Sequence, residues 1–118
     1  SYGDELAACQ RYFYKSYNDD VIPGTASELG AYYRTVDAVT PYASTGPLRY
    51  AVTMRATPTV TFYAPSTGTS GKITCEGDKT PVIASNGQNG CSFYVSNDSS
   101  GLGVGSSCKA HLTAEAEL

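Results

Sequence analysis

The residues of this chain that could do covalent chemistry are few and scattered. It has one histidine, His111, and four cysteines far apart in sequence, Cys9, Cys75, Cys91 and Cys108. Nucleophilic catalysis needs a base beside the nucleophile and a third group that orients the base. One histidine in an alternating run, without a G-x-S-x-G sequence, does not make that set. We therefore interpret His111 as a packed or exposed polar residue of a strand and predict no catalytic residue.

Paired carboxylates are a second kind of residue that could act on a substrate, because glycoside hydrolysis uses two acids that flank one bond. Three pairs occur, in predicted turns or near the end of the sequence: Asp19/Asp20, Glu76/Asp78 and Glu115/Glu117. Solvated acids are expected at such places. An enzyme that cleaves glycosidic bonds with paired carboxylates is therefore an alternative hypothesis, and a non-enzymatic protein is the leading one.

The cysteines do not follow a metal-binding pattern. None is spaced as C-x-x-C, and one histidine cannot complete a structural zinc site. The twelve-residue calcium loop is absent, so we predict no metal and no cofactor. Free thiols are favoured, since disulfide-stapled domains are usually shorter and richer in cysteine. If a disulfide forms, the expected pair is Cys75 with Cys91 across a hairpin.

Composition argues against several classes of partner. The net charge is −3 and the eight Lys and Arg are scattered, so no basic stripe is available for a phosphate backbone and nucleic acid is not expected. No apolar run approaches the roughly 18 residues that span a bilayer, so membrane insertion is not expected. The acidic residues 1–5 do not resemble a signal peptide.

Alternating side chains predict strands on both sides of Pro58. Apolar and polar residues alternate over residues 48–55 and again over residues 59–63, which places one set on each face of a sheet. Proline cannot donate a ladder hydrogen bond, so Pro58 belongs at a strand start or an edge. Ten tyrosines, against three phenylalanines and no tryptophan, suit half-buried sheet faces.

The rest of the chain continues this pattern. Residues 4–8 could start a short helix before a Tyr-Phe-Tyr run that favours strand, and further strands are predicted at residues 30–39, 72–76, 81–85, 91–96 and 104–116. Asn-Gly steps and Gly-rich clusters supply the turns. About eight short strands with regular turns predict an all-β fold, an antiparallel β-sandwich or jelly roll, as a single domain over residues 1–118.

Three segments resemble motifs of one known family. Residues 5–14, ELAACQRYFY, resemble the ELALCQRYY opening of C-terminal domains of bacteriophage tail fibres and related virion proteins. Residues 54–63, MRATPTVTFY, resemble the family's MRATPTVT segment, and residues 110–118, AHLTAEAEL, are similar to its H-x-TADAEL ending. The three segments occur in the family's order. The stretch 66–109, with three of the four cysteines, matches nothing in that pattern.

The resemblance implies a non-catalytic receptor-binding domain at the distal tip of a tail fibre. It implies binding to bacterial surface polysaccharide, either capsule or lipopolysaccharide, during host recognition and adsorption. It also implies a homotrimer within the virion, assembled in the bacterial cytoplasm, where thiols stay reduced. The alternatives are a small capsule-polysaccharide depolymerase that uses the paired carboxylates described above and a fibre trimerisation cap without its own ligand.

Tyrosine and asparagine side chains are the candidates for contact with such a glycan. An aromatic ring stacks on the C–H face of a sugar, and an amide both donates and accepts hydrogen bonds. The candidate ligand-binding residues are Tyr32, Tyr33, Tyr42, Asn86 and Asn89. The competing interpretation for each is packing within a sheet or a subunit interface.

Overall fold

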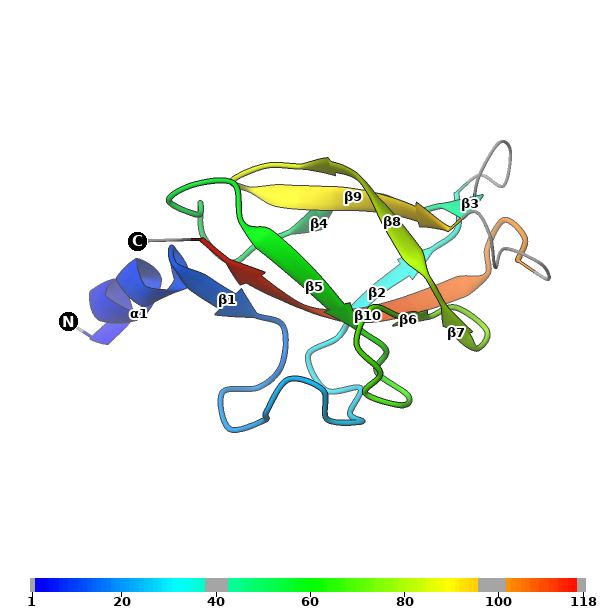
Figure 1. Cartoon of the computed structure of the whole chain (residues 1–118), viewed down its shortest axis with the longest axis horizontal. Coiled ribbons are helices and arrows are strands. Elements are labelled where there is room, and N and C mark those ends of the chain that lie inside the picture. The colour runs from blue at the N-terminus through cyan, green and yellow to red at the C-terminus, as the bar shows by residue number, and fades with distance from the viewer. Residues whose placement is uncertain (1, 38–42, 96–101, 117–118) are drawn as a thin grey trace.

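The computed structural model describes residues 2–37, 43–95 and 102–116, which form an elongated body of 47 × 26 × 20 Å (Figure 1). In chain order these residues form one helix and ten strands: α1 (Tyr2–Gln10), β1 (Phe13–Lys15), β2 (Tyr32–Thr35), β3 (Ala43–Ser44), β4 (Leu48–Arg49), β5 (Thr59–Tyr63), β6 (Ile73–Thr74), β7 (Asp78–Lys79), β8 (Pro81–Asn86), β9 (Gly90–Val95) and β10 (Ser107–Glu115).

The larger sheet is built around β10, the longest strand. Along one side β10 pairs with β1 and then with β2, and along the other side with β5 and then with β6. β7 extends the sheet beyond β6, and every pairing is antiparallel. Each side of β10 is therefore lined by two successive strands. The chain leaves the sheet between them as two insertions, residues 16–31 and residues 64–72.

The smaller sheet is built in the same way around β9. β3 and β4 pair with successive parts of β9 on one side, and β8 pairs with it on the other, with a bulge between Ile83 and Ser85. The two sheets form two layers in Figure 1, with β8 and β9 above β5 and β10. Helix α1 lies at one end of the body and none of its residues is buried.

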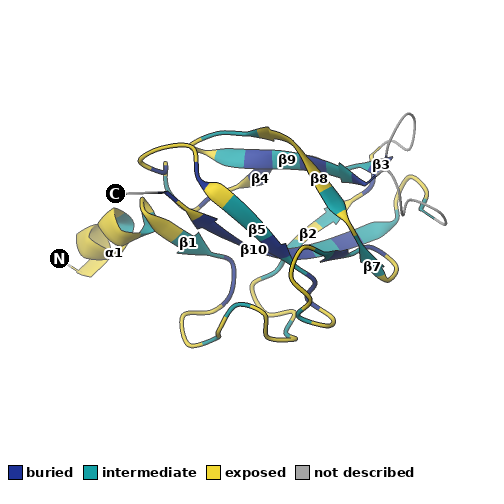
Figure 2. Cartoon of the chain, in the orientation of Figure 1, coloured by how far each residue is buried: buried dark blue, intermediate teal, exposed yellow. Residues whose placement is uncertain are grey.

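The core lies between the two sheets. Alternate residues of β10 and β9 point into it, and the rings of Phe62 and Phe93 meet edge to face across it at 5.4 Å. The dark strands of Figure 2 mark this layer. A period of two therefore organises both sheets. The apolar residues of the two central strands that are buried in this core are Cys91, Phe93, Val95, Cys108, Ala110, Leu112 and Ala114.

The predicted all-β character is confirmed as two antiparallel sheets with one short helix. The strands number ten among the described residues, not about eight. Of the predicted strand over 48–55 only Leu48–Arg49 pairs with a neighbour, although burial still alternates, with Tyr50 and Met54 buried. The reason is that their amides donate to the carbonyls of Asn89 and Gln88 in the turn between β8 and β9, and not to a strand.

The cysteine predictions are wrong for two of the four residues. Cys75 and Cys108 form a disulfide with 4.3 Å between their Cα atoms, whereas Cys9 and Cys91 are free. Cys108 lies in β10 and Cys75 directly follows β6, so the pairing of these two strands brings the sulfurs together. Cys91 lies in the other sheet, in β9. The predicted bridge from Cys75 to Cys91 therefore does not form.

The two insertions pack together on the outer face of the larger sheet. Their backbones meet at Gly24 and Gly68, where a Cβ atom added to Gly68 would lie 2.1 Å from the Gly24 carbonyl oxygen. The Tyr17 hydroxyl accepts a hydrogen bond from the Gly24 amide at 3.2 Å, and the Tyr17 ring meets that of Tyr63 edge to face. We call this paired structure the insertion lobe, and define it as residues 16–31 and 64–72.

Alanine substitutions at two glycines test this contact. Gly68 and Gly71 have nearly the same positive φ, +78° and +77°, but a Cβ at Gly71 meets nothing within 4 Å. Both variants incur the left-handed backbone cost of about 1–2 kcal/mol. The free energy of unfolding of Gly68→Ala should fall by about 1–3 kcal/mol more than that of Gly71→Ala, because the backbone carbonyl of Gly24 must move. Urea unfolding measures both losses, and equal values for the two variants would contradict the packed lobe.

Candidate functional site

Beside the insertion lobe, one cross-strand row crosses the outer face of the larger sheet. Lys109 of β10 pairs with Tyr33 of β2 on one side and with Thr74 of β6 on the other, and Thr74 pairs with Asp78 of β7. Directly paired residues share a face of the sheet. The residues that flank Lys109 along β10 are buried in the core, so this row points away from the core. We call Tyr33, Lys109, Thr74 and Asp78 the outer row.

The first insertion contributes an acid to the outer row. The carboxylate of Glu28 accepts a hydrogen bond from Lys109 Nζ at 2.6 Å, as an ion pair. Its hydrogen bond and its charge raise the pKa of the Lys109 ammonium. Because Glu28 is 59 % exposed, water screens this pair and its effect on stability is small. The main consequence of the ion pair is that it fixes the position of the Lys109 ammonium on the face that Lys109 shares with Tyr33.

The second insertion contributes hydroxyl groups at the opposite end of the outer row. Thr67 Oγ1 donates to one oxygen of Asp78 at 2.8 Å, and Ser66 Oγ lies 3.4 Å from the other. Ser66 Oγ also lies 3.0 Å from Thr74 Oγ1, and Thr67 Oγ1 lies 2.8 Å from Thr69 Oγ1. The Asp78 carboxylate is therefore held in a fixed orientation among exposed hydroxyls.

Tyr33 is the predicted ligand residue that stands free for contact. It is 56 % exposed and lies at the Lys109 end of the outer row. An exposed aromatic ring beside a fixed ion pair, hydroxyls and a carboxylate offers both an apolar platform and directional hydrogen bonds. Saccharide binding needs this combination, because sugars present C–H faces and hydroxyl edges together.

Tyr32 and Asn86 lie instead in a network inside the protein. The Tyr32 hydroxyl donates to the Arg49 carbonyl and lies 3.0 Å from the Tyr14 hydroxyl. Burial is the main cause that raises the pKa of the Tyr32 hydroxyl, and the hydrogen bond with Tyr14 is the second. The amide of Asn86 accepts from the Tyr50 hydroxyl at 2.9 Å and donates to the Pro58 carbonyl at 2.7 Å. The structure therefore uses both side chains in packing.

The other two predicted ligand residues are not part of the outer row. Asn89 is exposed in the turn between β8 and β9, where its side-chain oxygen accepts from Thr53 Oγ1 at 2.7 Å. Tyr42 lies outside the described residues. Of the four predicted residues that the structure describes, it brings one, Tyr33, to the outer row.

The only histidine is buried and holds the insertion lobe. Its Nε2 lies 2.8 Å from the Ser27 carbonyl, which only accepts, so Nε2 carries the hydrogen. Its Nδ1 lies 2.7 Å from Ser16 Oγ, which already accepts the Leu112 amide hydrogen and donates to Nδ1. Tyr17 stacks on the ring with 3.7 Å between centroids. Of the two alternatives that the sequence left open for His111, a packed or an exposed polar residue of a strand, the structure shows the packed one.

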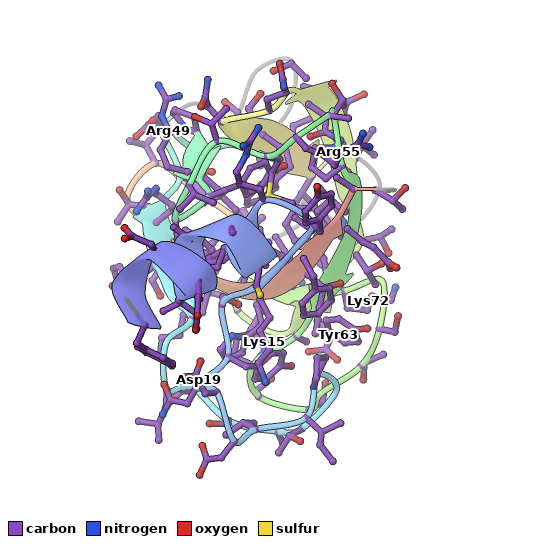
Figure 3. All side chains as sticks on the ribbon, turned by 90° about the vertical axis from the view of Figure 1, so that its left-hand side faces the viewer. Lys15, Asp19, Arg49, Arg55, Tyr63 and Lys72 are labelled. Atoms are coloured by element: carbon purple, nitrogen blue, oxygen red, sulfur yellow. A yellow bond between two sulfur atoms is a disulfide. The ribbon has the colours of Figure 1, made fainter. Side chains whose placement is uncertain are left out.

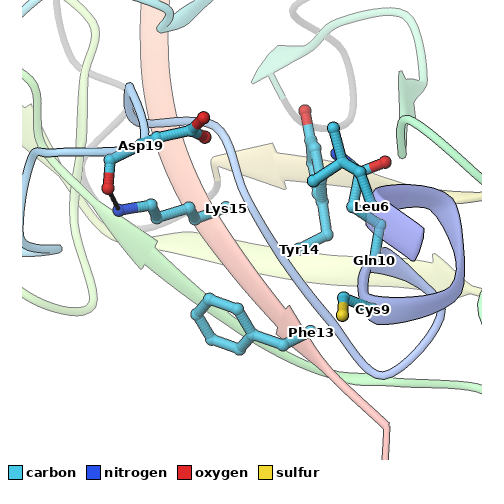
Figure 4. A pocket seen from close by; sticks show the side chains of 7 residues that line it. All are labelled: Leu6, Cys9, Gln10, Phe13, Tyr14, Lys15 and Asp19. Atoms are coloured by element: carbon cyan, nitrogen blue, oxygen red, sulfur yellow. Dashed lines mark hydrogen bonds between the residues drawn. The ribbon is translucent and has the colours of Figure 1, made fainter. Parts of the chain in front are cut away.

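A small open groove lies between α1 and β1 (Figure 4). It has a volume of about 200 Å³ and is lined by Leu6, Cys9, Gln10, Phe13, Tyr14, Lys15 and Asp19. Lys15 Nζ is held by the carbonyls of Asp19 and Val21, at 2.9 and 2.7 Å. Small-molecule sites usually enclose 300–1,000 Å³, so this groove does not form an enclosed binding site.

The acids of these pairs that the structure describes do not line a common cleft. Asp19 and Asp20 are exposed in the first insertion, and Glu76 is exposed in a turn where its φ is 55°. Asp78 belongs to the outer row, and Glu117 lies outside the described residues. Within the described ranges no three His, Cys, Asp or Glu side chains gather in a way that could hold a metal ion. No described helix has the length and apolar character needed to cross a membrane.

Figure 3 shows the molecule from the α1 end. Lys15, Asp19 and Tyr63 lie on the side of the insertion lobe, whereas Arg49 and Arg55 lie on the opposite side, at the smaller sheet. The lysines of the outer face near the outer row are Lys109 and Lys72, which directly precedes β6 and whose Nζ donates to Thr80 Oγ1 at 2.6 Å.

Sequence reasoning missed three of the four residues of the outer row as ligand candidates. Asp78 was considered only as half of an acid pair, and Lys109 and Thr74 were not considered. One signal was available for Lys109. It lies between the two apolar residues Cys108 and Ala110 in an alternating run, which places it on the outer face.

A comparison of the chain with known protein families, with characterised proteins and with solved structures gives no match.

Proposed function

We propose that this chain is the receptor-binding tip domain of a bacteriophage tail fibre, which binds a bacterial surface polysaccharide without cleaving it. The outer row supports this proposal, since an exposed Tyr33 ring stands beside the fixed polar groups of Lys109, Glu28 and Asp78. The motif resemblance at residues 5–14, 54–63 and 110–118 supplies the class of partner. The ligand is capsule or lipopolysaccharide of the host.

The proposal includes a homotrimer with jelly-roll connectivity at the distal end of the fibre. A shallow site of one ring and a few polar groups binds a sugar weakly. Three copies on one fibre raise the effective concentration and can multiply the avidity 10²–10⁴-fold. A shallow site is then sufficient for adsorption, and no deep pocket is required.

Binding of the purified domain to host cells tests the function. The domain should bind the cells, block adsorption of the phage, sediment as a trimer and release no reducing sugar from host polysaccharide. Sugar release would support the depolymerase instead. A trimer that binds no cells would support the trimerisation cap, and either outcome would overturn the proposal.

Tyr33→Ala should lower the apparent affinity for host cells at least tenfold, because loss of aromatic stacking costs about 0.5–1.5 kcal/mol per site and three sites act together. Tyr33→Phe keeps the ring and should retain most of the binding. The matched control is Tyr2→Ala, which removes a 72 % exposed tyrosine from α1. Flow cytometry with labelled domain measures all three variants. Equal losses for Tyr33→Ala and Tyr2→Ala would contradict the outer row as the binding site.

A further inference from the structure

The outer row is charge-balanced. The outer face around it carries two lysines, Lys109 and Lys72, and two carboxylates, Glu28 and Asp78, so the formal charges cancel. Both lysines have partners: Lys109 Nζ donates to Glu28 at 2.6 Å and Lys72 Nζ to Thr80 at 2.6 Å. The carboxylate of Asp78 accepts hydrogen bonds from hydroxyls and faces no cation in these contacts.

This balance is unfavourable for an acidic ligand. A carboxylate or phosphate on the ligand would have to take Lys109 from Glu28, and the released Glu28 would then repel it. Asp78 at the far end of the outer row would add a second repulsion. Charge-assisted bonds are roughly twice as strong as neutral ones. Because both lysines of the outer face already have partners, an acidic glycan gains no such bond there to offset the cost of its own desolvation. The guanidinium of Arg34, which pairs with the core-facing Cys108, is bound to the carbonyls of Tyr33 and Pro47.

The same balance suits an uncharged sugar. Neighbouring sugar hydroxyls can donate to the Asp78 carboxylate, which is already oriented by Thr67 and Ser66. Further hydroxyls can exchange hydrogen bonds with Thr74 and Thr69. Tyr33 then supplies the apolar platform at the other end of the outer row.

We infer that the outer row recognises uncharged glycan units and that Glu28 is the specificity-determining residue, because it neutralises Lys109 and so keeps acidic polysaccharides out. The inference rests on the proposed glycan-binding function and names the ligand class of that same site. Glu28 comes from the first insertion, so the specificity is set by a loop residue and not by the strands.

An array of purified bacterial polysaccharides, neutral and uronate-containing, tests the inference with the whole chain. The unmodified protein should bind neutral polysaccharides, with apparent affinity changing less than about twofold between roughly 0.05 and 0.5 M salt, since no net ion pairing forms with the ligand. Tighter binding to uronate polysaccharides, weakened by salt, would overturn the inference.

Glu28→Gln should free Lys109 and raise the apparent affinity for uronate polysaccharides about tenfold. The double variant Glu28→Gln/Lys109→Gln should lose this gain, because the gain comes from the released ammonium. Glu5→Gln is the matched control, as it removes the same charge from α1. No gain with Glu28→Gln would overturn the role of Glu28.

The outcomes also separate this inference from the proposed function. Binding to host cells together with a preference for acidic polysaccharides would overturn the ligand class and leave adhesion standing. Absence of binding to host cells and to every polysaccharide on the array would overturn both.

Discussion

Replacing both Cys75 and Cys108 by alanine should lower the free energy of unfolding by about 3–4 kcal/mol. The disulfide closes a loop between residues 33 positions apart, and the loss of loop entropy in the unfolded chain accounts for a value of this size. A domain of this length should then melt roughly 10–15 °C lower. Urea unfolding followed by circular dichroism measures the change.

Two controls isolate the covalent bond from the loss of sulfur atoms. Cys9→Ala removes an exposed free thiol and should change stability by less than about 0.5 kcal/mol. Reduction of the unmodified protein breaks the bond but keeps both sulfur atoms. It should therefore reproduce most of the stability loss seen in the double variant. If the free energy of unfolding of the double variant lies within about 1 kcal/mol of that of the unmodified protein, the disulfide contributes little to stability.

Three of the strands that the sequence predicted well have one face packed on the core. Residues 59–63 and 91–96 correspond closely to β5 and β9, and residues 104–116 contain β10. In each, apolar side chains recur at every second position because the opposite sheet covers one face. Local alternation is therefore enough to locate a strand, and the antiparallel all-β character follows from several such strands.

Pairings between distant segments could not be predicted in the same way. The disulfide depends on the register of β6 against β10, which brings Thr74 beside Lys109. That register is set by the insertion at residues 64–72, whose length and path are not encoded in any local pattern. A disulfide between Cys75 and Cys91 would need a hairpin that joins their strands, but the two residues belong to different sheets.

The outer row shows the same limit at the candidate site. Its four residues come from four strands, so only the assembled sheet reveals them as neighbours. Tyr32 and Tyr33 illustrate the difficulty, since identical side chains at adjacent positions carry no signal of which one points outward. The hydroxyl of Tyr32 finds partners in Tyr14 and Arg49, and this leaves Tyr33 on the outer face.

His111→Gln should destabilise the protein by about 2–3 kcal/mol at pH 8. The ring is fully buried, stacks on Tyr17 and bonds at both nitrogens, to Ser16 and to the Ser27 carbonyl. A glutamine cannot reach both partners and stack at once, so at least one buried polar group is left unpaired. The insertion lobe should loosen first, because Ser27 lies within it, and faster amide hydrogen exchange in residues 16–31 should report this.

The pH dependence of the same variant separates titration from packing. Burial lowers the pKa of His111 below its ordinary value, and the bond to the Ser27 carbonyl opposes this only in part. The unfolded chain therefore binds the proton more readily than the folded one. The resulting stability is complete above about pH 6.5 and is lost as the pH falls toward the lower pKa of the folded state.

His111→Gln removes the only histidine, so it should remove this part of the pH dependence as well. The stability gap between the two proteins should be widest at pH 8 and should narrow toward pH 5, because only the unmodified protein loses stability through this group. Urea unfolding at half-unit pH steps measures the gap. A gap that stays constant from pH 8 to pH 5 would mean that the folded protein binds the His111 proton as readily as the unfolded chain. Protonated His111 would then not destabilise the insertion lobe.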